Sequence, residues 1–114
     1  KIKKIYDSLL KDALKVRGRL LIFKYYSIVS LSSDLANELV YRRPKSIVVV
    51  AKEKESEYSM SIRSSENDVK LPKILNKIVN KIPDSFGGGH DHAGGLSIKK
   101  EYFDEFVDIL KKEI

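Results

Sequence analysis

The sequence predicts an α/β domain with a mixed sheet of about four or five strands and helices packed on its faces. Three features predict it. Amphipathic helical spacing occurs in several separate segments, the run Ile47-Val48-Val49-Val50 is continuously β-branched, and residues 58–63 alternate between apolar and polar. A continuous apolar run is typical of a strand covered on both faces, whereas alternation is typical of a strand with one polar face. The 114 residues favour one compact domain.

The N-terminal part of the chain predicts a helix followed by a strand. Apolar residues recur at helical spacing over residues 2–17 with lysines between them, and Gly18 can end that helix. Residues 20–30 are apolar and aromatic with a β-branched end, which indicates a strand.

A helix and a second strand are predicted next. Ser32 or Ser33 caps the helix, Asp34 suits its N-terminal dipole, and Pro44 stops it. The strand at 46–51 then completes a βαβ crossover.

The rest of the chain predicts a hairpin, two helices and a short strand. A polar turn at 53–57 leads to a strand at 58–63 that returns along its predecessor. Apolar spacing indicates helices at 71–82 and 103–114, with a short strand at 96–98. A glycine-rich loop therefore lies between a helix and a late strand.

The net charge of +6 is concentrated at the N-terminus. Residues 1–24 contain eight basic and two acidic residues, and the remaining 90 contain fourteen of each. A basic end favours an acidic partner such as nucleic acid. A solvated face of a lysine-rich protein explains the same pattern, and both interpretations stay open. We divide the chain into a basic helix at 1–19 and an α/β domain at 20–114.

Composition narrows the class of protein. No apolar run approaches the roughly 20 residues needed to span a bilayer, so no membrane partner is expected. The chain has no cysteine, which removes disulfides and thiolate metal sites and fits a cytoplasmic location. Lys1 stands where a start methionine would be, so we expect a piece of a longer protein.

Five of the six glycines lie between Gly87 and Gly95. Consecutive glycines leave backbone N–H groups accessible, and successive N–H groups can bind an anion. His90 and His92 can each add a hydrogen bond or a positive charge. Gly87, Gly88, Gly89, His90 and His92 are therefore candidate phosphate-binding residues, and a side chain at Gly88 would block the phosphate and conflict with a positive φ. The competing interpretation is a flexible connector.

The segment His90-Asp91-His92 also carries potential metal ligands. No other histidine exists to complete a site, so we predict no metal here. The segment is neither a P-loop nor a dinucleotide fingerprint, since the required spacing and flanking residues are absent.

Arg63 and Ser64 are further candidates for binding substrate phosphate. Arg63 ends a strand whose polar face also carries Ser59 and Ser61, and a guanidinium can hold a phosphate through two hydrogen bonds. Alone, Arg63 is better explained as a surface arginine; together with the glycines it becomes a phosphate-binding candidate. No set of catalytic residues is visible.

These motifs resemble the DHH-associated domain, the C-terminal domain of DHH phosphoesterases such as RecJ-type exonucleases, oligoribonucleases and cyclic-dinucleotide phosphodiesterases. The resemblance rests on Arg63-Ser64, the 71–82 helix and the loop Gly87-Gly88-Gly89-His90-Asp91-His92-Ala93-Gly94-Gly95, and covers roughly residues 20–114. The chain departs from the family pattern at Gly94, where alanine is usual, and at Phe86, where many members have glycine.

The resemblance implies that Arg63 and the loop clamp substrate phosphates. Catalysis would come from an N-terminal DHH domain of the same protein that binds Mn or Mg, and the basic helix at 1–19 would connect this chain to it. This chain alone would then not be an enzyme and would need no cofactor. Implied partners are single-stranded nucleic acid, a short oligonucleotide or a dinucleotide. One alternative is an RNA-binding module, free-standing or of the tRNA-synthetase type; another is a protein-interaction domain that uses the basic N-terminal helix.

Overall fold

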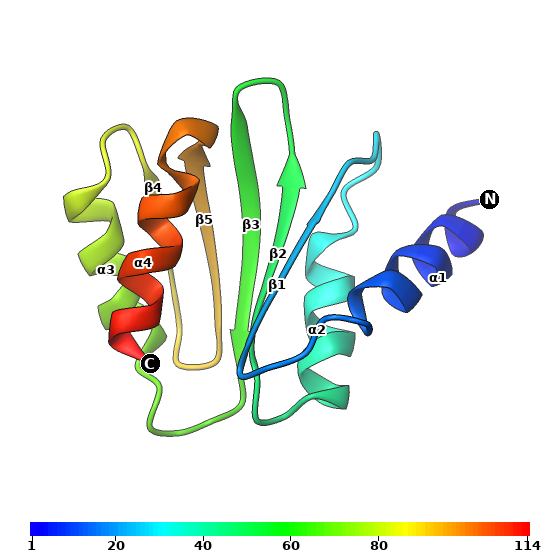
Figure 1. Ribbon diagram of the computed structural model, residues 1–114, viewed down its shortest axis with the longest axis horizontal. Helices are drawn as coiled ribbons and strands as arrows, with labels where there is room; N and C mark the ends of the chain where they lie inside the picture. Colours follow the sequence, from blue (N-terminus) through cyan, green and yellow to red (C-terminus); the bar gives the residue numbers. More distant parts are fainter.

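The computed structural model describes residues 1–114 and contains one five-stranded mixed sheet (Figure 1). The strand order is β1-β2-β3-β5-β4; β1 and β2 are parallel and every other neighbouring pair is antiparallel. The predicted fold class is confirmed. The strands are β1 (Leu20–Tyr25), β2 (Ile47–Glu53), β3 (Glu57–Ser64), β4 (Phe86–Gly89) and β5 (Ala93–Lys99).

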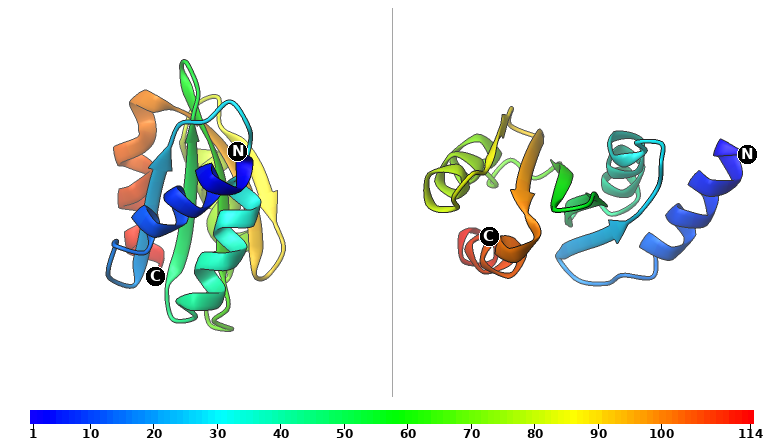
Figure 2. Two further views of the ribbon diagram at one scale, coloured as in Figure 1. Left: turned by 90° about the vertical axis from the view of Figure 1, so that its right-hand side faces the viewer. Right: turned by 90° about the horizontal axis from the view of Figure 1, so that it is seen from above.

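Four helices cover the two faces of this sheet (Figure 2). Helix α2 lies on one face with α1 packed outside it, while α3 and α4 belong to the other side. None of these helices is long and apolar enough to span a bilayer. The helices are α1 (Ile2–Ala13), α2 (Ser32–Arg42), α3 (Leu71–Lys81) and α4 (Phe103–Glu113), the last preceded by a short 3₁₀ turn, η1 (Lys100–Tyr102).

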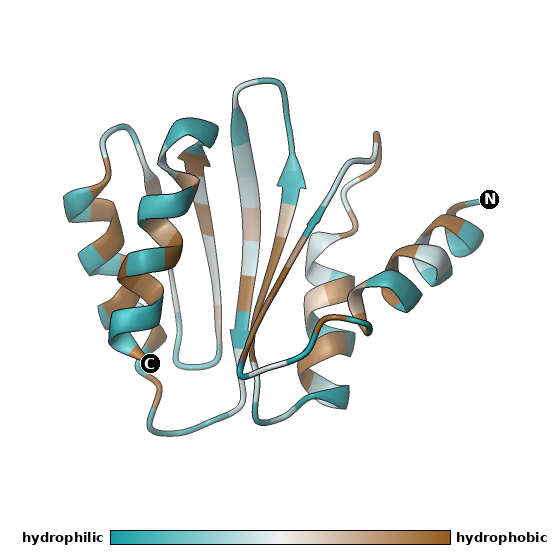
Figure 3. Ribbon diagram, viewed as in Figure 1, coloured by the Kyte–Doolittle hydropathy of each residue, from teal (hydrophilic) through white to brown (hydrophobic).

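The sheet separates two hydrophobic cores, and β2 contributes to both. Ile47, Val49 and Ala51 pack into the larger core with α3 and α4, whereas Val48 and Val50 pack into the smaller core with α1 and α2. All five residues are fully buried. The prediction of a strand covered on both faces is therefore confirmed, as are the βαβ crossover and the hairpin after it. Figure 3 shows the apolar residues in β1, β2 and stripes along the helices.

Two predicted elements are shorter than expected because tertiary contacts end them. The helix predicted to residue 17 stops at Ala13. Arg43, which follows α2, donates Nη2 to the Leu14 carbonyl at 2.7 Å and Nη1 to the Val16 carbonyl at 3.2 Å. The N–H groups of Lys15 and Val16 bond carbonyls three residues back, those of Asp12 and Ala13, so the helix ends in tightened turns, and Arg43 binds carbonyls left free beyond them.

The strand predicted to residue 30 ends at Tyr25. The Tyr25 hydroxyl accepts a hydrogen bond from the Leu31 N–H at 3.0 Å and pairs with Ser32 Oγ at 2.6 Å, which closes the intervening segment. Ser32 consequently does not cap α2. The N-cap residue is Leu31 and no side chain caps the helix, so the predicted serine cap was wrong.

The glycine-rich segment, residues 87–95, follows α3, and most of it is a β-hairpin where a loop was expected. Gly87, Gly88 and Gly89 belong to β4 and pair with Leu96, Gly95 and Gly94 of β5. Only the three residues His90-Asp91-His92 form the turn. Glycine has low strand propensity, so the sequence pattern did not reveal this edge strand, which is defined by its pairing with β5.

Candidate phosphate site

The alternation of β3 places Ser61 and Arg63 on the face that also carries α2, while Ile62 and Ser64 point into the opposite face. The Arg63 guanidinium bridges α2 and the hairpin. Its Nε donates to Asn37 Oδ1 at 2.7 Å, and its Nη1 donates to the carbonyls of Ile62 and Gly94 at 2.9 and 3.2 Å. These three bonds fix the plane of the guanidinium.

Arg63 has no anionic partner. None of the seven ion pairs in the structure involves it, and its Nη2 group makes no hydrogen bond within the protein. Partial burial lowers the pKa of Arg63, since desolvation disfavours the charged form. A guanidinium nevertheless stays charged at neutral pH. The result is a rigidly held cation with two free N–H donors, an arrangement suited to an oxyanion.

A strip of backbone without side chains lies beside Arg63. Gly95 pairs with Ser61 on β3 and with Gly88 on β4, so these three residues cross the sheet in one row. Residues directly opposite each other in an antiparallel sheet share a face, so the row lies on the Arg63 side. An open hollow of about 390 Å³ lies here, called the Arg63 hollow below; it is lined by Ser33, Ser61, Arg63, Gly88, Gly89, His90, Ala93, Gly94 and Gly95.

The glycines of the hairpin fall into two groups. A Cβ at Gly89 would lie 2.5 Å from the Ala93 carbonyl oxygen, one at Gly87 would collide with the backbone of Gly95, and one at Gly94 would collide with the Leu75 side chain. Close packing therefore explains these three glycines.

Gly88 and Gly95 form the second group. A Cβ at Gly88 would meet nothing within 4 Å, and one at Gly95 would make only an ordinary contact of 3.6 Å with the Met60 carbonyl oxygen. Neither residue has a positive φ, so the expectation of a positive φ at Gly88 was wrong. Packing does not require glycine at either position, and the two face each other across the floor of the Arg63 hollow.

The backbone N–H groups do not form the predicted concavity for an anion. The His90 N–H donates to the Ala93 carbonyl at 2.8 Å, and Gly88 and Gly95 are paired in the same ladder. Because N–H directions alternate in an antiparallel strand, those of Gly87 and Gly89 point to the open edge of the sheet. A ligand can therefore approach the floor of the hollow closely, but the positive charge that attracts an anion comes from side chains.

His90 is exposed and lines the Arg63 hollow, whereas Ser64 and His92 lie outside it. Ser64 is 1% exposed. Its N–H donates to the His92 carbonyl at 3.1 Å, and its own carbonyl lies 2.7 Å from His92 Nδ1, which donates in the matching tautomer. Ser64 and His92 thus fasten the hairpin turn to the end of β3. Gly87 also lies outside the hollow, at the open edge beside α3.

The side chains of this domain do not fit a metal ion. No group of three or more histidine, aspartate and glutamate side chains lies together with the geometry needed to hold one. His90 and His92 line different hollows, so the histidines of the turn do not converge on one point.

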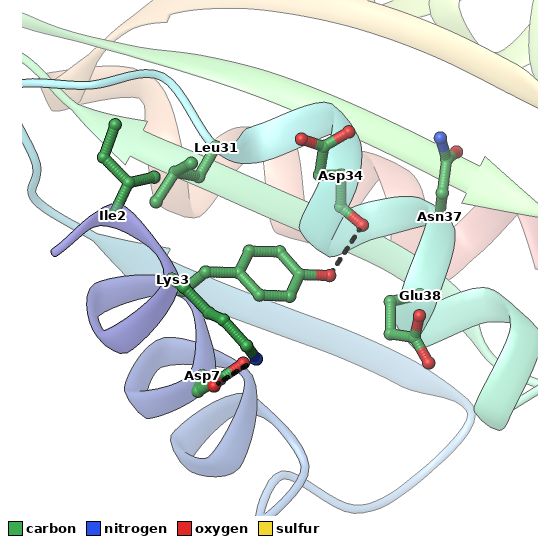
Figure 4. Close-up of a pocket in the computed structure, with 8 residues that line it drawn as sticks. Ile2, Lys3, Asp7, Leu31, Asp34, Asn37 and Glu38 are labelled. Carbon is green, nitrogen blue, oxygen red and sulfur yellow. Dashed lines mark hydrogen bonds and ion pairs between the residues drawn. The ribbon is translucent and has the colours of Figure 1, made fainter.

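A larger cavity, of about 620 Å³, lies between α1 and α2 (Figure 4). Lys3 pairs with Asp7 at 2.9 Å, and the Tyr6 hydroxyl donates to the Asp34 carbonyl at 3.2 Å. Three carboxylates against one lysine disfavour a phosphate there. The cavity is lined by Ile2, Lys3, Tyr6, Asp7, Leu31, Asp34, Asn37 and Glu38. The basic N-terminal helix therefore adjoins an acidic cavity. In Figure 1 it lies beyond α2 from β4 and β5, the hairpin that contributes Gly88 and Gly95 to the Arg63 hollow.

Asn37, which orients Arg63, is a residue that sequence patterns did not reveal. It lies 26 residues before its partner on an exposed face of α2. Nothing in its local pattern separates it from a solvated helix residue, and only the packing of α2 on β3 brings the two together.

Similarity to known proteins identifies the family to which this geometry belongs. A family model of the DHHA1 domain matches residues 28–114. The chain belongs to the DHHA1 domain family. The predicted relationship to the DHH-associated domain is thereby confirmed. No curated protein matches the sequence.

Solved structures with this DHHA1 fold come from several kinds of protein. The C-Ala domain of Aquifex aeolicus alanyl-tRNA synthetase is 24% identical with a TM-score of 0.65, over 83% of this chain and 91% of that one. RecJ from Thermus thermophilus, in complex with Mg²⁺, is 12% identical with a TM-score of 0.75, over 96% and 17%. A pGpG-specific phosphodiesterase from Vibrio cholerae is 15% identical with a TM-score of 0.59, over 95% and 40%. This chain thus spans nearly all of the C-Ala domain but under a fifth of RecJ.

Proposed function

We propose that this DHHA1 domain binds a phosphate group of a nucleic-acid or nucleotide substrate in the Arg63 hollow and presents the substrate to a DHH catalytic domain of the same protein. Arg63 supplies a fixed cation with two free donors. His90 lines the same hollow and can donate a further hydrogen bond. The resemblance noted in the sequence points to the same residues.

The observation that carries this proposal is the pair Gly88 and Gly95. Glycine weakens a strand interior relative to alanine, by roughly 0.5–1 kcal/mol. Packing leaves room for a Cβ at both positions, so folding gives no reason for glycine there. A ligand that approaches the backbone closely does give one. Both residues lie on the floor of the hollow that contains the unpaired Arg63.

The role of this domain is binding and orientation, and its side chains do not fit a catalytic metal. In this proposal, hydrolysis of the phosphodiester takes place in the DHH domain, where Mn or Mg would activate the attacking water. The DHHA1 domain would hold the substrate so that the scissile bond meets that centre. Single-stranded nucleic acid, short oligonucleotides and dinucleotides are the substrates we propose.

An RNA-binding module is the second candidate function. The observation that favours it is coverage, since the chain spans 91% of the C-Ala domain of an alanyl-tRNA synthetase. Binding of an RNA hairpin far more tightly than a dinucleotide would favour this candidate. Binding of a dinucleotide as tightly as the RNA hairpin would favour the phosphoesterase role.

The proposed function is tested by titrating the 114-residue chain with inorganic phosphate and with the 5′-phosphorylated dinucleotide pdApdA, followed by NMR amide shifts. We expect both ligands to shift Gly88, Gly95 and Ala93. Gly88→Ala and Gly95→Ala should remain folded and weaken both ligands. Ser59→Ala is the control: it changes a residue on the same strand face that does not line the hollow, and it should leave phosphate binding unchanged. Unchanged binding by both glycine variants would refute the site.

A further inference from the structure

Phe86, the first residue of β4, has a side chain that no packing contact explains. Its exposed fraction is 66%, it belongs to neither hydrophobic core, and it stacks on no other aromatic ring. No lysine or arginine lies over its ring either. A large exposed aromatic at the edge of a sheet is unfavourable for the isolated fold, so its position relative to the Arg63 hollow is informative.

Strand alternation places Phe86 on the Arg63 face. Phe86 pairs with Ser97, Gly88 pairs with Gly95, and side chains two residues apart on a strand share a face. Phe86 therefore lies about 7 Å along the strand from Gly88 and about 14 Å from His90. The ring stands at one end of the glycine strip, and Arg63 with His90 stands at the other.

The charges along this face differ between the two ends. Beside Phe86, the Ser97 hydroxyl donates to a carboxylate oxygen of Glu57. Lys99 at the same end pairs with Asp84 at 3.2 Å, so its charge is compensated. Arg63, at the far end, is the unpaired cation that lines the glycine strip. Lys52 also has no ion-pair partner, but its Nζ donates to the Ile28 carbonyl at 3.4 Å and it lies on β2, three strands from Phe86. A nucleotide on the glycine strip is thus favoured with its phosphate toward Arg63 and its base toward Phe86.

We propose that Phe86 stacks against a nucleobase of the substrate whose phosphate lies in the Arg63 hollow. This inference rests on the proposed function and extends it from phosphate recognition to recognition of an unpaired base. Aromatic rings on an open sheet face are a general platform for single-stranded bases, because every base has a face that stacks. The site would therefore select single-stranded nucleic acid or a dinucleotide over a simple phosphate ester, with little preference for base identity.

The experiment compares pdApdA with inorganic phosphate on the 114-residue chain by NMR titration. In the wild type, pdApdA should shift the ring protons of Phe86 and the amides of the Arg63 hollow, whereas inorganic phosphate should shift only the hollow. Phe86→Ala should weaken pdApdA roughly 5- to 150-fold, the range for loss of one stacked base, and leave inorganic phosphate unchanged. Phe86→Trp should restore binding. Tyr26→Ala, which removes an exposed aromatic of 72% exposure outside this face, should have no effect.

The outcomes separate the two proposals. If Phe86→Ala binds pdApdA as the wild type does while phosphate still shifts the hollow, stacking is refuted and the phosphate site stands. If neither ligand shifts the Arg63 hollow in the wild type, the proposed function fails, and the stacking role fails with it. Failure of Phe86→Trp to restore binding would also overturn stacking, since tryptophan offers a larger ring face.

Discussion

The two faces of the β4–β5 hairpin contrast sharply although the same short strands form them. On one face, Leu96 and Ile98 are buried in the larger core, and Gly94 leaves room for Leu75 of α3. On the other face, Gly88 and Gly95 form an open floor beside Arg63. Glycines in one short motif can therefore be present for two different reasons. Close packing requires some of its glycines, and the proposed access for a ligand explains the others.

The largest expected effect is on the open face, at Arg63. Arg63→Ala should weaken binding of inorganic phosphate and pdApdA by about 10- to 150-fold, because a hydrogen bond to a charged group contributes about 1.5–3 kcal/mol. Arg63→Lys keeps the charge but cannot hold Asn37 and two carbonyls as one planar group, so it should give intermediate affinity. NMR or calorimetric titration checks both. If Arg63→Ala bound both ligands with wild-type affinity, the open face would not be the phosphate site.

The second prediction compares a packed glycine with an open one. Gly89→Ala should destabilise the fold by about 1–3 kcal/mol, since its Cβ would lie 2.5 Å from two backbone atoms. Gly88→Ala should leave stability unchanged or slightly raised while ligand binding falls. Thermal melts with parallel titrations measure both quantities. If the two variants lost equal stability, the claim that packing requires Gly89 but not Gly88 would be wrong.

The smallest effect is expected from the basic helix α1. Lys4 and Lys11 are exposed on α1, which lies beyond α2 from the β4–β5 hairpin (Figure 1). The double variant Lys4→Gln/Lys11→Gln should change pdApdA affinity by less than about twofold, consistent with weak surface charge effects.

Longer single strands give the complementary measurement. If α1 contacts their phosphates, the same double variant should reduce the slope of log K against log salt by about 1.4, at about 0.7 per phosphate. Binding at two or more salt concentrations measures this. A large loss of pdApdA affinity in the double variant would show that the basic helix belongs to the phosphate site, against the separation seen in the structure.

Local sequence was sufficient to predict the fold class and the family. Periodicity identified the four helices and four of the five strands, because those segments carry their own hydrophobic patterns. Arg63 and the glycine segment were recognised through residue types that local spacing and family resemblance can reveal. The phosphate role that those residues suggested stays a prediction.

The grouping of those residues, in contrast, depends on tertiary contacts. Pairing with β5 makes Gly87, Gly88 and Gly89 part of an edge strand. The Ser64 carbonyl and His92 Nδ1 bind each other instead of lying beside Arg63. Asn37 reaches Arg63 from α2. The same packing separates Gly88 and Gly95 from the glycines that the fold requires. These outcomes depend on which strand pairs with β5 and which helix covers β3. Such contacts join residues far apart in the chain, and no local pattern of residues records them.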